Sequence, residues 1–215
     1  TGTATGIQIS ANNVLIDGCI VESAHDRARL LFNSDGYAVT LKNSVFYGRG
    51  ETQENAPVYL YSGTAINCVF AQYSGIGSKS SYSIFGNYGS ITLTNCGLFG
   101  SSAAKGGSSS LSATNCYTDQ SSPPSGFTTV AFDTSTGSGF EGTSSTTKDF
   151  RLKSTSALID AGTSTGAPST DIIGTSRPQG TSYDVGAWEY KAAGGSTDTP
   201  VAPGAGSLTF SGYAP

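Results

Sequence analysis

The feature that constrains this chain most is an internal repeat. Residues 91–99 read Ile-Thr-Leu-Thr-Asn-Cys-Gly-Leu-Phe, and the same plan recurs at residues 14–22, 39–47, 64–71 and 111–119. Aligned on Cys19, Ser44, Cys68, Cys96 and Cys116, the five copies are separated by 25, 24, 28 and 20 residues. Self-similarity at a period of roughly 20–50 residues is typical of solenoids, in which each repeat packs against its neighbours.

Within each copy the apolar side chains alternate with polar ones, which predicts a half-buried strand. In residues 91–99 the alternation slips at the Asn95–Cys96 step, so two short strands are expected to meet there at a bend. Four copies carry Asn at this bend and the first carries Gly18, both residue types that tolerate left-handed backbone angles. Stacked Asn side chains can also hydrogen-bond to one another.

A third apolar run precedes each of the first four copies, at residues 6–9, 29–32, 57–61 and 82–85. Three short strands per period and no helical periodicity predict an all-β fold, a parallel β-helix of about five rungs. Neighbouring rungs would lie about 4.8 Å apart, which is the strand spacing within a sheet. Parallel crossover connections are overwhelmingly right-handed, so we expect a right-handed helix.

The four cysteines occupy one position of the repeat, and Ser44 takes that position in the remaining copy. They form no CxxC pair, so their spacing matches no zinc site. In-register stacking places their side chains alongside one another rather than pointing at one another. We therefore expect free, buried thiols, and we predict no metal or cofactor.

Composition narrows the classes of function. The chain has 215 residues, 29 Gly, no Met and a net charge of −4. The acidic balance offers no basic surface for nucleic acid or an anionic membrane, and no apolar run approaches the ~20 residues of a membrane span. The apolar positions recur too regularly for a disordered chain. Thr1 and the lack of Met predict a processed or internal part of a longer polypeptide.

Charged residues gather in the loops after the first two copies, where residues 22–54 hold nine of them and the only histidine. The candidate site residues are Glu22, His25, Asp26, Arg27, Arg29, Arg49, Glu51 and Glu54. Equivalent loops of a solenoid stack on one flank, where paired carboxylates could cleave a glycan or a base beside a cation could support elimination. A solvated charged flank, glycan binding and catalysis all remain open, in that order of preference.

From Val130 the repeat gives way to a different pattern, which we call the C-terminal segment (residues 130–191). It contains KDFRL at 148–152, SALIDAG at 156–162, DIIG at 171–174, RP at 177–178 and DVGAWEY at 184–190. This run resembles the closing segment of bacterial and phage right-handed β-helix proteins of the pectate-lyase-like and tail-spike class. The chain departs from that pattern with Ala157 where Pro is usual and Trp188 where Tyr or Phe is common. The resemblance implies a β-helix with a C-terminal cap, but members include enzymes, adhesins and surface proteins, so it fixes no activity.

Asp160, Asp171, Arg177 and Asp184 of this segment look like a catalytic cluster, yet each lies beside Gly in a turn context. We favour a structural role. In this interpretation Arg177 pairs with one of the aspartates and ties loops across the open end of the helix, because a solenoid must cover its last rung. Trp188 would be the apolar lid of that cap.

The predicted domain plan follows from these patterns. It places the rungs at 1–129, the cap at 130–191, a Gly/Pro-rich linker at 192–206 and a terminal strand at 207–215. Leu208 and Phe210 alternate as in a strand, but one that is too short to be stable alone. We therefore expect the tail to pair with a sheet edge of another subunit.

Together these features favour a non-enzymatic extracellular or virion surface protein. It would be a self-assembling shaft or spike, a trimer or a filament, whose loops contact cell-surface polysaccharide. The alternative is a polysaccharide lyase or glycoside hydrolase of the β-helix type with its site on the charged flank. A lyase would also imply Ca²⁺ held by several oxygens. The small number of carboxylates on the strands, chiefly Asp17, counts against this alternative.

Overall fold

A computed structural model describes residues 4–23, 28–48, 58–72, 82–86, 89–101, 103–144 and 146–192. Over these residues the protein is all-β, as predicted, with sixteen strands and no helix. In the same part of the chain there is consequently no helix that is long and apolar enough to cross a membrane.

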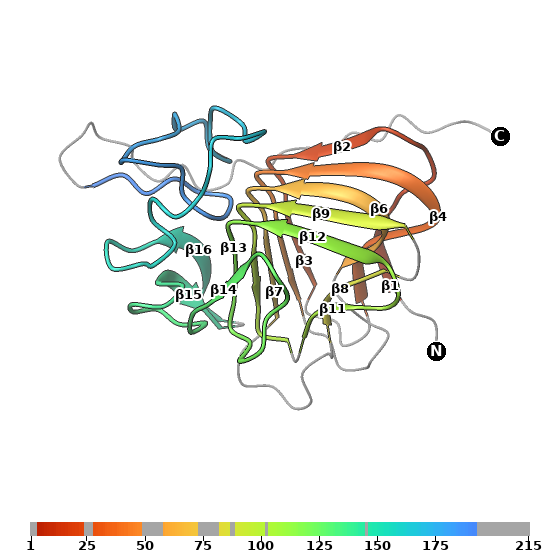
Figure 1. Ribbon diagram of the computed structural model, residues 1–215, viewed down its shortest axis with the longest axis horizontal. Coiled ribbons are helices and arrows are strands. Elements are labelled where there is room, and N and C mark those ends of the chain that lie inside the picture. Colours follow the sequence, from red (N-terminus) through yellow and green to blue (C-terminus); the bar gives the residue numbers. More distant parts are fainter. Residues whose placement is uncertain are drawn as a thin grey trace.

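The strands of the repeats form the three sides of a parallel solenoid (Figure 1). The first side stacks β2 (Val14–Asp17), β4 (Ala28–Lys42), β6 (Val58–Ile66), β9 (Ser90–Thr94) and β12 (Ser110–Thr114). The second side stacks β3 (Ile20–Ser23), β5 (Val45–Gly48), β7 (Val69–Gln72), β10 (Gly97–Phe99), β13 (Cys116–Thr118) and β14 (Phe127–Thr129). The third side combines β1 (Ala4–Gln8), the first parts of β4 and β6, β8 (Tyr82–Phe85) and β11 (Ala103–Gly106).

Regular winding extends over about three turns, fewer than the five rungs that the repeat count predicts. The first and second sides follow the repeat closely, whereas the third side is irregular. There, β6 and β8 share only two paired positions, Val58 with Ile84 and Tyr59 with Phe85. Counting the corners between the first and second sides therefore overestimates the number of regular turns.

The bend between the first and second sides has the backbone conformation that the sequence predicts. Asn43, Asn67, Asn95 and Asn115 all have positive φ, between 42° and 53°, and Gly18 has a φ of 67°. A left-handed residue at one position of every copy turns the chain through the same corner each time. We call these residues the corner asparagines.

The interior of the solenoid is an apolar core that includes the stacked cysteines. All four cysteines are free, as predicted; the predicted burial is confirmed for Cys68, Cys96 and Cys116, whereas Cys19 is only partly buried. The Cys96 thiol lies 3.3 Å from the carbonyl oxygens of Ala65 and Thr94. Burial raises the pKa values of Cys96 and Cys116 well above the usual value for a thiol, so these thiols stay protonated and act as small core side chains.

The central strands of the second side, β5, β7 and β10, are buried on both faces. Phe46, Phe70 and Leu98 point into the interior core, while Val45, Tyr47, Val69, Ala71 and Phe99 form a second core with the C-terminal segment. Phe99 stacks on Phe132 with ring centroids 5.3 Å apart and meets Phe140 edge-to-face at 5.6 Å. Aromatic side chains therefore stabilise the contact between the second side and the C-terminal segment, both by burying a large apolar area and by favourable ring–ring geometry.

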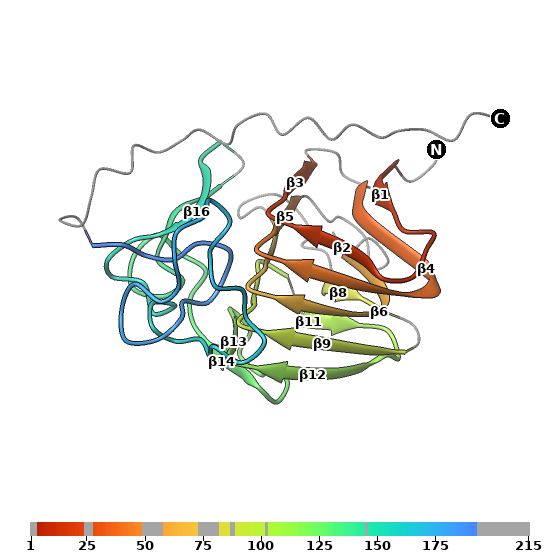
Figure 2. The same ribbon diagram turned by 90° about the horizontal axis from the view of Figure 1, so that it is seen from above.

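The C-terminal segment lies against the side of the solenoid (Figure 2). Its two strands, β15 (Phe140–Thr143) and β16 (Lys148–Leu152), form an antiparallel hairpin, and the chain after the hairpin is irregular. The sequence analysis placed it as a cap over the last rung, with Trp188 as the lid. The structure differs, because the segment packs along the outer face of the second side, and Trp188 packs in that lateral core.

Candidate functional site

Of the candidate side chains on the charged flank, the structure describes only that of Glu22. Glu22 on β3 forms an ion pair with Lys148 on β16, and both side chains are about one-third exposed. The backbone of Arg29 belongs to β4, but its side chain lies outside the described part. The other candidates also lie outside the described residues: His25, Asp26, Arg27, Arg49, Glu51 and Glu54.

Glu22 thus faces the hairpin of the C-terminal segment. Its register partner on β5 is Tyr47, whose hydroxyl donates to the carbonyl of Thr143 on β15 at 2.9 Å. The sequence analysis did not anticipate Lys148 as the partner of Glu22, because the two residues are far apart in the chain. In the described part, Glu22 helps to hold the hairpin against the second side.

A second group of polar residues, the corner asparagines, binds the backbone of the C-terminal segment. Asn43 donates to the carbonyl of Thr170 at 3.2 Å, and Asn67 donates to the carbonyls of Asp184 at 2.9 Å and Gly186 at 3.2 Å. Asn95 donates to the carbonyl of Thr163 at 2.7 Å. Asn115 donates to the carbonyl of Ala161 at 2.9 Å. Each of the four copies with Asn at the corner therefore contributes one attachment point. The side chains also contact one another, since Asn95 donates to the Oδ1 of Asn67 at 3.3 Å.

Asn95 forms hydrogen bonds to the C-terminal segment through its side chain and its backbone. Its amide nitrogen donates to Thr163, its Oδ1 accepts from the Thr163 backbone N–H at 2.9 Å, and its carbonyl accepts from the Gly186 N–H at 2.9 Å. The sequence analysis explained the asparagines by the turn, for which Gly would serve equally well, and by hydrogen bonds between stacked side chains, which the Asn95–Asn67 bond confirms; it did not predict their bonds to the C-terminal segment. The signal for a second role was the preference for Asn over Gly in four of the five copies.

Arg177 and Glu189 form an ion pair in which both side chains are fully buried. The Arg177 Nη1 lies 2.7 Å from a Glu189 carboxylate oxygen, and its Nη2 donates to the carbonyls of Gly186 and Ala187, each at 3.0 Å. The prediction that Arg177 pairs with an aspartate was wrong. Glu189 takes that place because the chain from Asp184 to Glu189 wraps around the guanidinium.

The aspartates of the predicted cluster bind backbone amides. Asp184 accepts from the N–H groups of Asp160 and Tyr190. Asp171 accepts from Ile173, Thr175 and Glu189, and Asp160 accepts from Ser182. A carboxylate that is saturated by backbone donors fixes loop geometry, and this arrangement fits the structural role that we favoured over catalysis.

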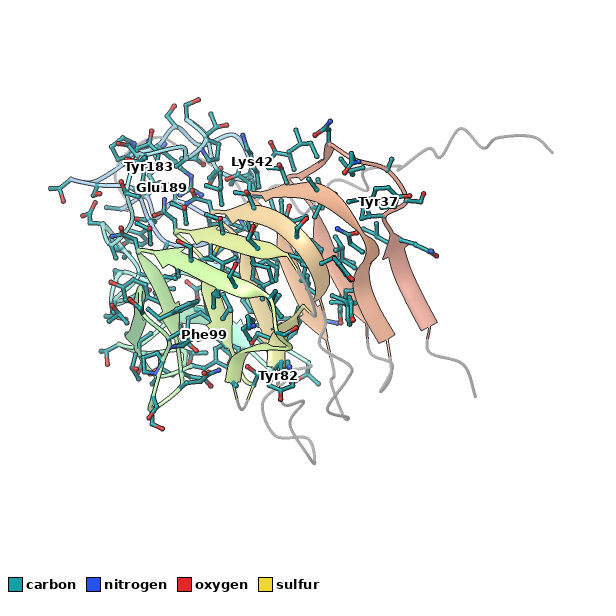
Figure 3. All side chains as sticks on the ribbon, turned by 45° about the vertical axis from the view of Figure 1, so that its right-hand side comes forward. Tyr37, Lys42, Tyr82, Phe99, Tyr183 and Glu189 are labelled. Carbon is teal, nitrogen blue, oxygen red and sulfur yellow. The ribbon has the colours of Figure 1, made fainter. Side chains whose placement is uncertain are left out.

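Asn67 and Arg177 meet at shared atoms. Both bind the carbonyl oxygens of Gly186 and Asp184, with the Arg177 Nη1 at 3.4 Å from the latter. We call the group formed by Asn67, Asp184, Gly186, Arg177 and Glu189 the joint. In Figure 3, Glu189 and Tyr183 lie beside the end of the first side that carries Lys42. The joint connects the third corner of the solenoid to the buried ion pair of the C-terminal segment.

Within the joint, the carboxyl of Asp184 is the group whose pKa departs most clearly from its ordinary value. Its pKa is raised to about 6, chiefly by burial and also by the nearby Glu189 carboxylate, while hydrogen bonds from the backbone amides of Asp160 and Tyr190 and the charge of Arg177 oppose the shift. Because the folded state holds this proton more tightly than the unfolded state, the contribution of Asp184 to stability is greatest below its ordinary pKa of 3.8 and is lost as the pH rises through about 6.

We therefore expect the free energy of unfolding to increase by about 1 kcal/mol when the pH is lowered from 7 to 5. The pKa values of Asp133 and Asp149 are lowered despite burial, because hydrogen bonds stabilise their carboxylates. These two groups therefore change the free energy of unfolding only in more acidic solution. Urea titrations should be carried out on the variant His25→Gln, which removes the single histidine of the chain, the residue type whose ordinary pKa of ~6.5 falls in this range. A stability that stays constant or falls between pH 7 and pH 5 would contradict the assignment.

The arrangement of polar groups is that of an internal attachment. Across the described part, no three His, Cys, Asp or Glu side chains gather as they would around a metal ion. The polar side chains at the corners and in the joint hold one part of the chain against another, and their donors and acceptors are directed at backbone groups and at one another. Comparison with known proteins found no matching family model, no matching curated protein and no matching solved structure.

Proposed function

We propose that this chain is a non-enzymatic structural module of an extracellular or virion surface, a β-helical shaft or spike of the pectate-lyase-like and tail-spike kind. The observation that supports this most is how the buried charges are used. Arg177, Glu189 and the neighbouring aspartates are committed to backbone groups and to each other. Catalysis by a carboxyl requires an oxygen that can reach a substrate, whereas these oxygens stiffen the attachment of the C-terminal segment.

The surface of the first side is compatible with this role. Its outward row runs through Thr40, Thr64, Thr92 and Ser112 in direct register. Uncharged hydroxyls keep such a face hydrated without creating a field of one sign. We propose that contact with cell-surface polysaccharide takes place at the loops of the charged flank. We also propose that copies of the protein associate as a trimer or filament through residues 207–215, which lie outside the described residues, as does the linker at 193–206.

The proposal is tested by offering the intact chain a panel of neutral and anionic polysaccharides and measuring binding and cleavage together. We expect binding without new reducing ends or unsaturated products. The double variant Arg27→Ala/Arg49→Ala should weaken binding by about tenfold. Lys42→Ala, which removes one positive charge from the first side, should leave binding unchanged. Time-dependent product formation that Glu51→Gln abolishes would instead establish the lyase or hydrolase alternative.

A further inference from the structure

One stretch of the C-terminal segment, residues 184–190, connects its buried charges to the solenoid, and we call it the strap. The N–H of Gly186 donates to the carbonyl of Asn95 at 2.9 Å. Three residues of the strap belong to the lateral core: Val185, Ala187 and Trp188. The strap therefore fastens the C-terminal segment to the outer face of the second side.

A single carboxyl group holds both ends of the strap. Asp184 is 1% exposed, and one of its carboxyl oxygens accepts from the N–H of Tyr190 at the far end of the strap. The other oxygen accepts from the N–H of Asp160 at 2.7 Å. These hydrogen bonds connect the start of the strap to its end and to an earlier loop of the segment. The ionisation state of this carboxyl therefore affects how firmly the strap is closed.

The buried charges around Asp184 are not balanced. The Arg177 guanidinium binds the Glu189 carboxylate and backbone carbonyls, and its bond to Asp184 is to the carbonyl oxygen rather than to the carboxyl. The Asp171 carboxyl, in a residue that is 4% exposed, accepts from the N–H of Glu189. Three buried carboxyls thus share one guanidinium. When all of them are ionised the group carries excess negative charge, which is costly inside a protein and which one proton would reduce.

The hydrogen bonds in the described part indicate which carboxyl takes that proton. The ionisable residues that share hydrogen bonds with Asp184 or with its partners are Asp160, Asp171, Arg177, Glu189 and Tyr190. The solenoid contributes the uncharged corner residues Asn67 and Asn95. Glu189 is paired with Arg177, and Asp171 accepts from three N–H groups. Asp184 has two such donors and the Glu189 carboxylate nearby, and its pKa of about 6 agrees with this assignment.

We propose that the strap is a proton-controlled latch: it is held closed while the Asp184 carboxyl carries a proton, and it opens locally, with the solenoid still folded, when that carboxyl ionises. Opening gives the carboxylate access to water, which removes the cost of burying its charge. It also uncovers part of the lateral core, because Gly186 lies against Val69. The latch would operate whether or not the protein binds a polysaccharide, so its test is separate from that of the proposed function.

The pH range of the latch follows from the two pKa values of this carboxyl. In the closed strap the pKa of Asp184 is about 6, whereas in the open strap the carboxyl returns toward its ordinary pKa of 3.8. The proton therefore stabilises the closed strap fully below pH 3.8, and this stabilisation is lost as the pH rises through about 6. The opening equilibrium constant should increase about tenfold between pH 5 and pH 7.

Native-state hydrogen–deuterium exchange of the full chain tests the latch, with protection factors compared so that the intrinsic pH dependence of exchange cancels. We expect those of the Val185 and Gly186 amides to fall about tenfold from pH 5 to pH 7. Low concentrations of urea should not change them, because a local opening exposes little surface. The Val69 and Gly97 amides donate to carbonyls of the preceding turn of the solenoid. They should be more strongly protected and should exchange faster as urea is added.

Two variants, each in the His25→Gln background, assign the effect to one carboxyl. Asp184→Asn carries no charge at any pH and should abolish the pH dependence at Val185 and Gly186. Asp149→Asn is the matched control, because it removes from the same segment a carboxyl whose pKa is lowered, and it should leave the tenfold change in place. If Asp184→Asn does not fold, the comparison of strap and solenoid amides in the parent chain still decides.

Each result counts for or against the latch. A tenfold change at the strap amides, insensitive to low urea, present in Asp149→Asn and absent from Asp184→Asn, supports it. Constant protection between pH 5 and pH 7 overturns it, and so does a pH dependence that persists in Asp184→Asn. Equal protection and an equal response to urea in the strap and in the solenoid also overturn it, since the strap would then open only when the whole protein unfolds.

Discussion

Replacing Arg177 by alanine is expected to lower the free energy of unfolding by about 3–5 kcal/mol, because the substitution leaves the Glu189 carboxylate buried without its partner. The side chains of both residues are fully inaccessible to solvent. The carbonyls of Gly186 and Ala187 also lose the donors that the guanidinium supplies. Urea denaturation measures the loss, with fluorescence of the single Trp188 following the C-terminal segment and circular dichroism following the strands.

Two further variants separate charge from packing. Arg177→Lys keeps the charge but cannot reach the same carbonyls with a planar fork of donors, so it should lie between the wild type and Arg177→Ala. Arg177→Met/Glu189→Leu removes both charges and should recover the part of the loss that comes from the unpaired carboxylate, while the backbone carbonyls of Gly186 and Ala187 and the N–H groups of Gln179 and Asp184 remain without their partners. A loss of less than about 1 kcal/mol in Arg177→Ala would show that the pair is solvated in solution.

The two optical signals also test whether the solenoid and the C-terminal segment unfold together. Phe99 of β10 packs on Phe132 and Phe140, and Val45 and Val69 belong to the same lateral core. If this core couples the two parts, the transitions coincide in every variant. Separate transitions in Arg177→Ala would mean that the solenoid persists when the segment detaches.

The solenoid was predictable because its signals are local and repeated. A left-handed corner residue, alternating strands and a small residue after the corner recur in each copy, so one copy supports the interpretation of the next. The number of regular turns was overestimated because the loops that lead into the third side vary between copies. The residues at the corners do not predict the structure of those loops.

The place of the C-terminal segment was not predicted, although one signal pointed to it. Strands buried on one face alternate, as residues 91–94 do, whereas strands buried on both faces read as continuous apolar runs. The sequences Val-Phe-Tyr at 45–47, Val-Phe-Ala at 69–71 and Leu-Phe at 98–99 are such runs. They indicate that the second side is covered from outside, and only the C-terminal segment follows the repeats with enough apolar residues to cover it.

The ionic partners could not be found from the sequence for a different reason. The Glu22–Lys148 pair joins residues more than a hundred positions apart, and its formation depends on where the hairpin docks. The choice of Glu189 over an aspartate for Arg177 depends on how the loop between Asp184 and Glu189 turns. The order of charged residues in the sequence predicts that charges will pair. Which residues pair depends on the path of the backbone between them.

Asn67→Ala is the second large effect that we expect, with a loss of about 3–4 kcal/mol in the free energy of unfolding. The side chain is fully buried and donates to two carbonyls of the joint, and its oxygen accepts from Asn95. Alanine would lose these hydrogen bonds and would also have to hold a φ of 52°. Asn67→Gly loses the same hydrogen bonds but tolerates that φ, so it should be about 1 kcal/mol more stable than Asn67→Ala.

The exposed corner supplies the control for this prediction. Asn115 has nearly the same φ, 51°, and donates to one carbonyl, that of Ala161. Asn115→Ala should therefore cost about 2 kcal/mol, most of it from the backbone conformation. If Asn67→Ala costs no more than Asn115→Ala, the bonds to the joint contribute nothing and the asparagines serve the turn alone.

A double-mutant cycle then asks whether the corner and the buried ion pair act as one unit. Asn67 and Arg177 bind the same carbonyl oxygens of Asp184 and Gly186. Once Arg177 is removed, these carbonyls are freer to move away from Asn67, so the second substitution should cost less than it does alone. We expect the double variant to be less destabilised than the sum of the two single variants by about 1 kcal/mol or more. Strict additivity would mean that the solenoid corner and the ion pair stabilise the segment independently, and that the shared carbonyls carry no coupling between them.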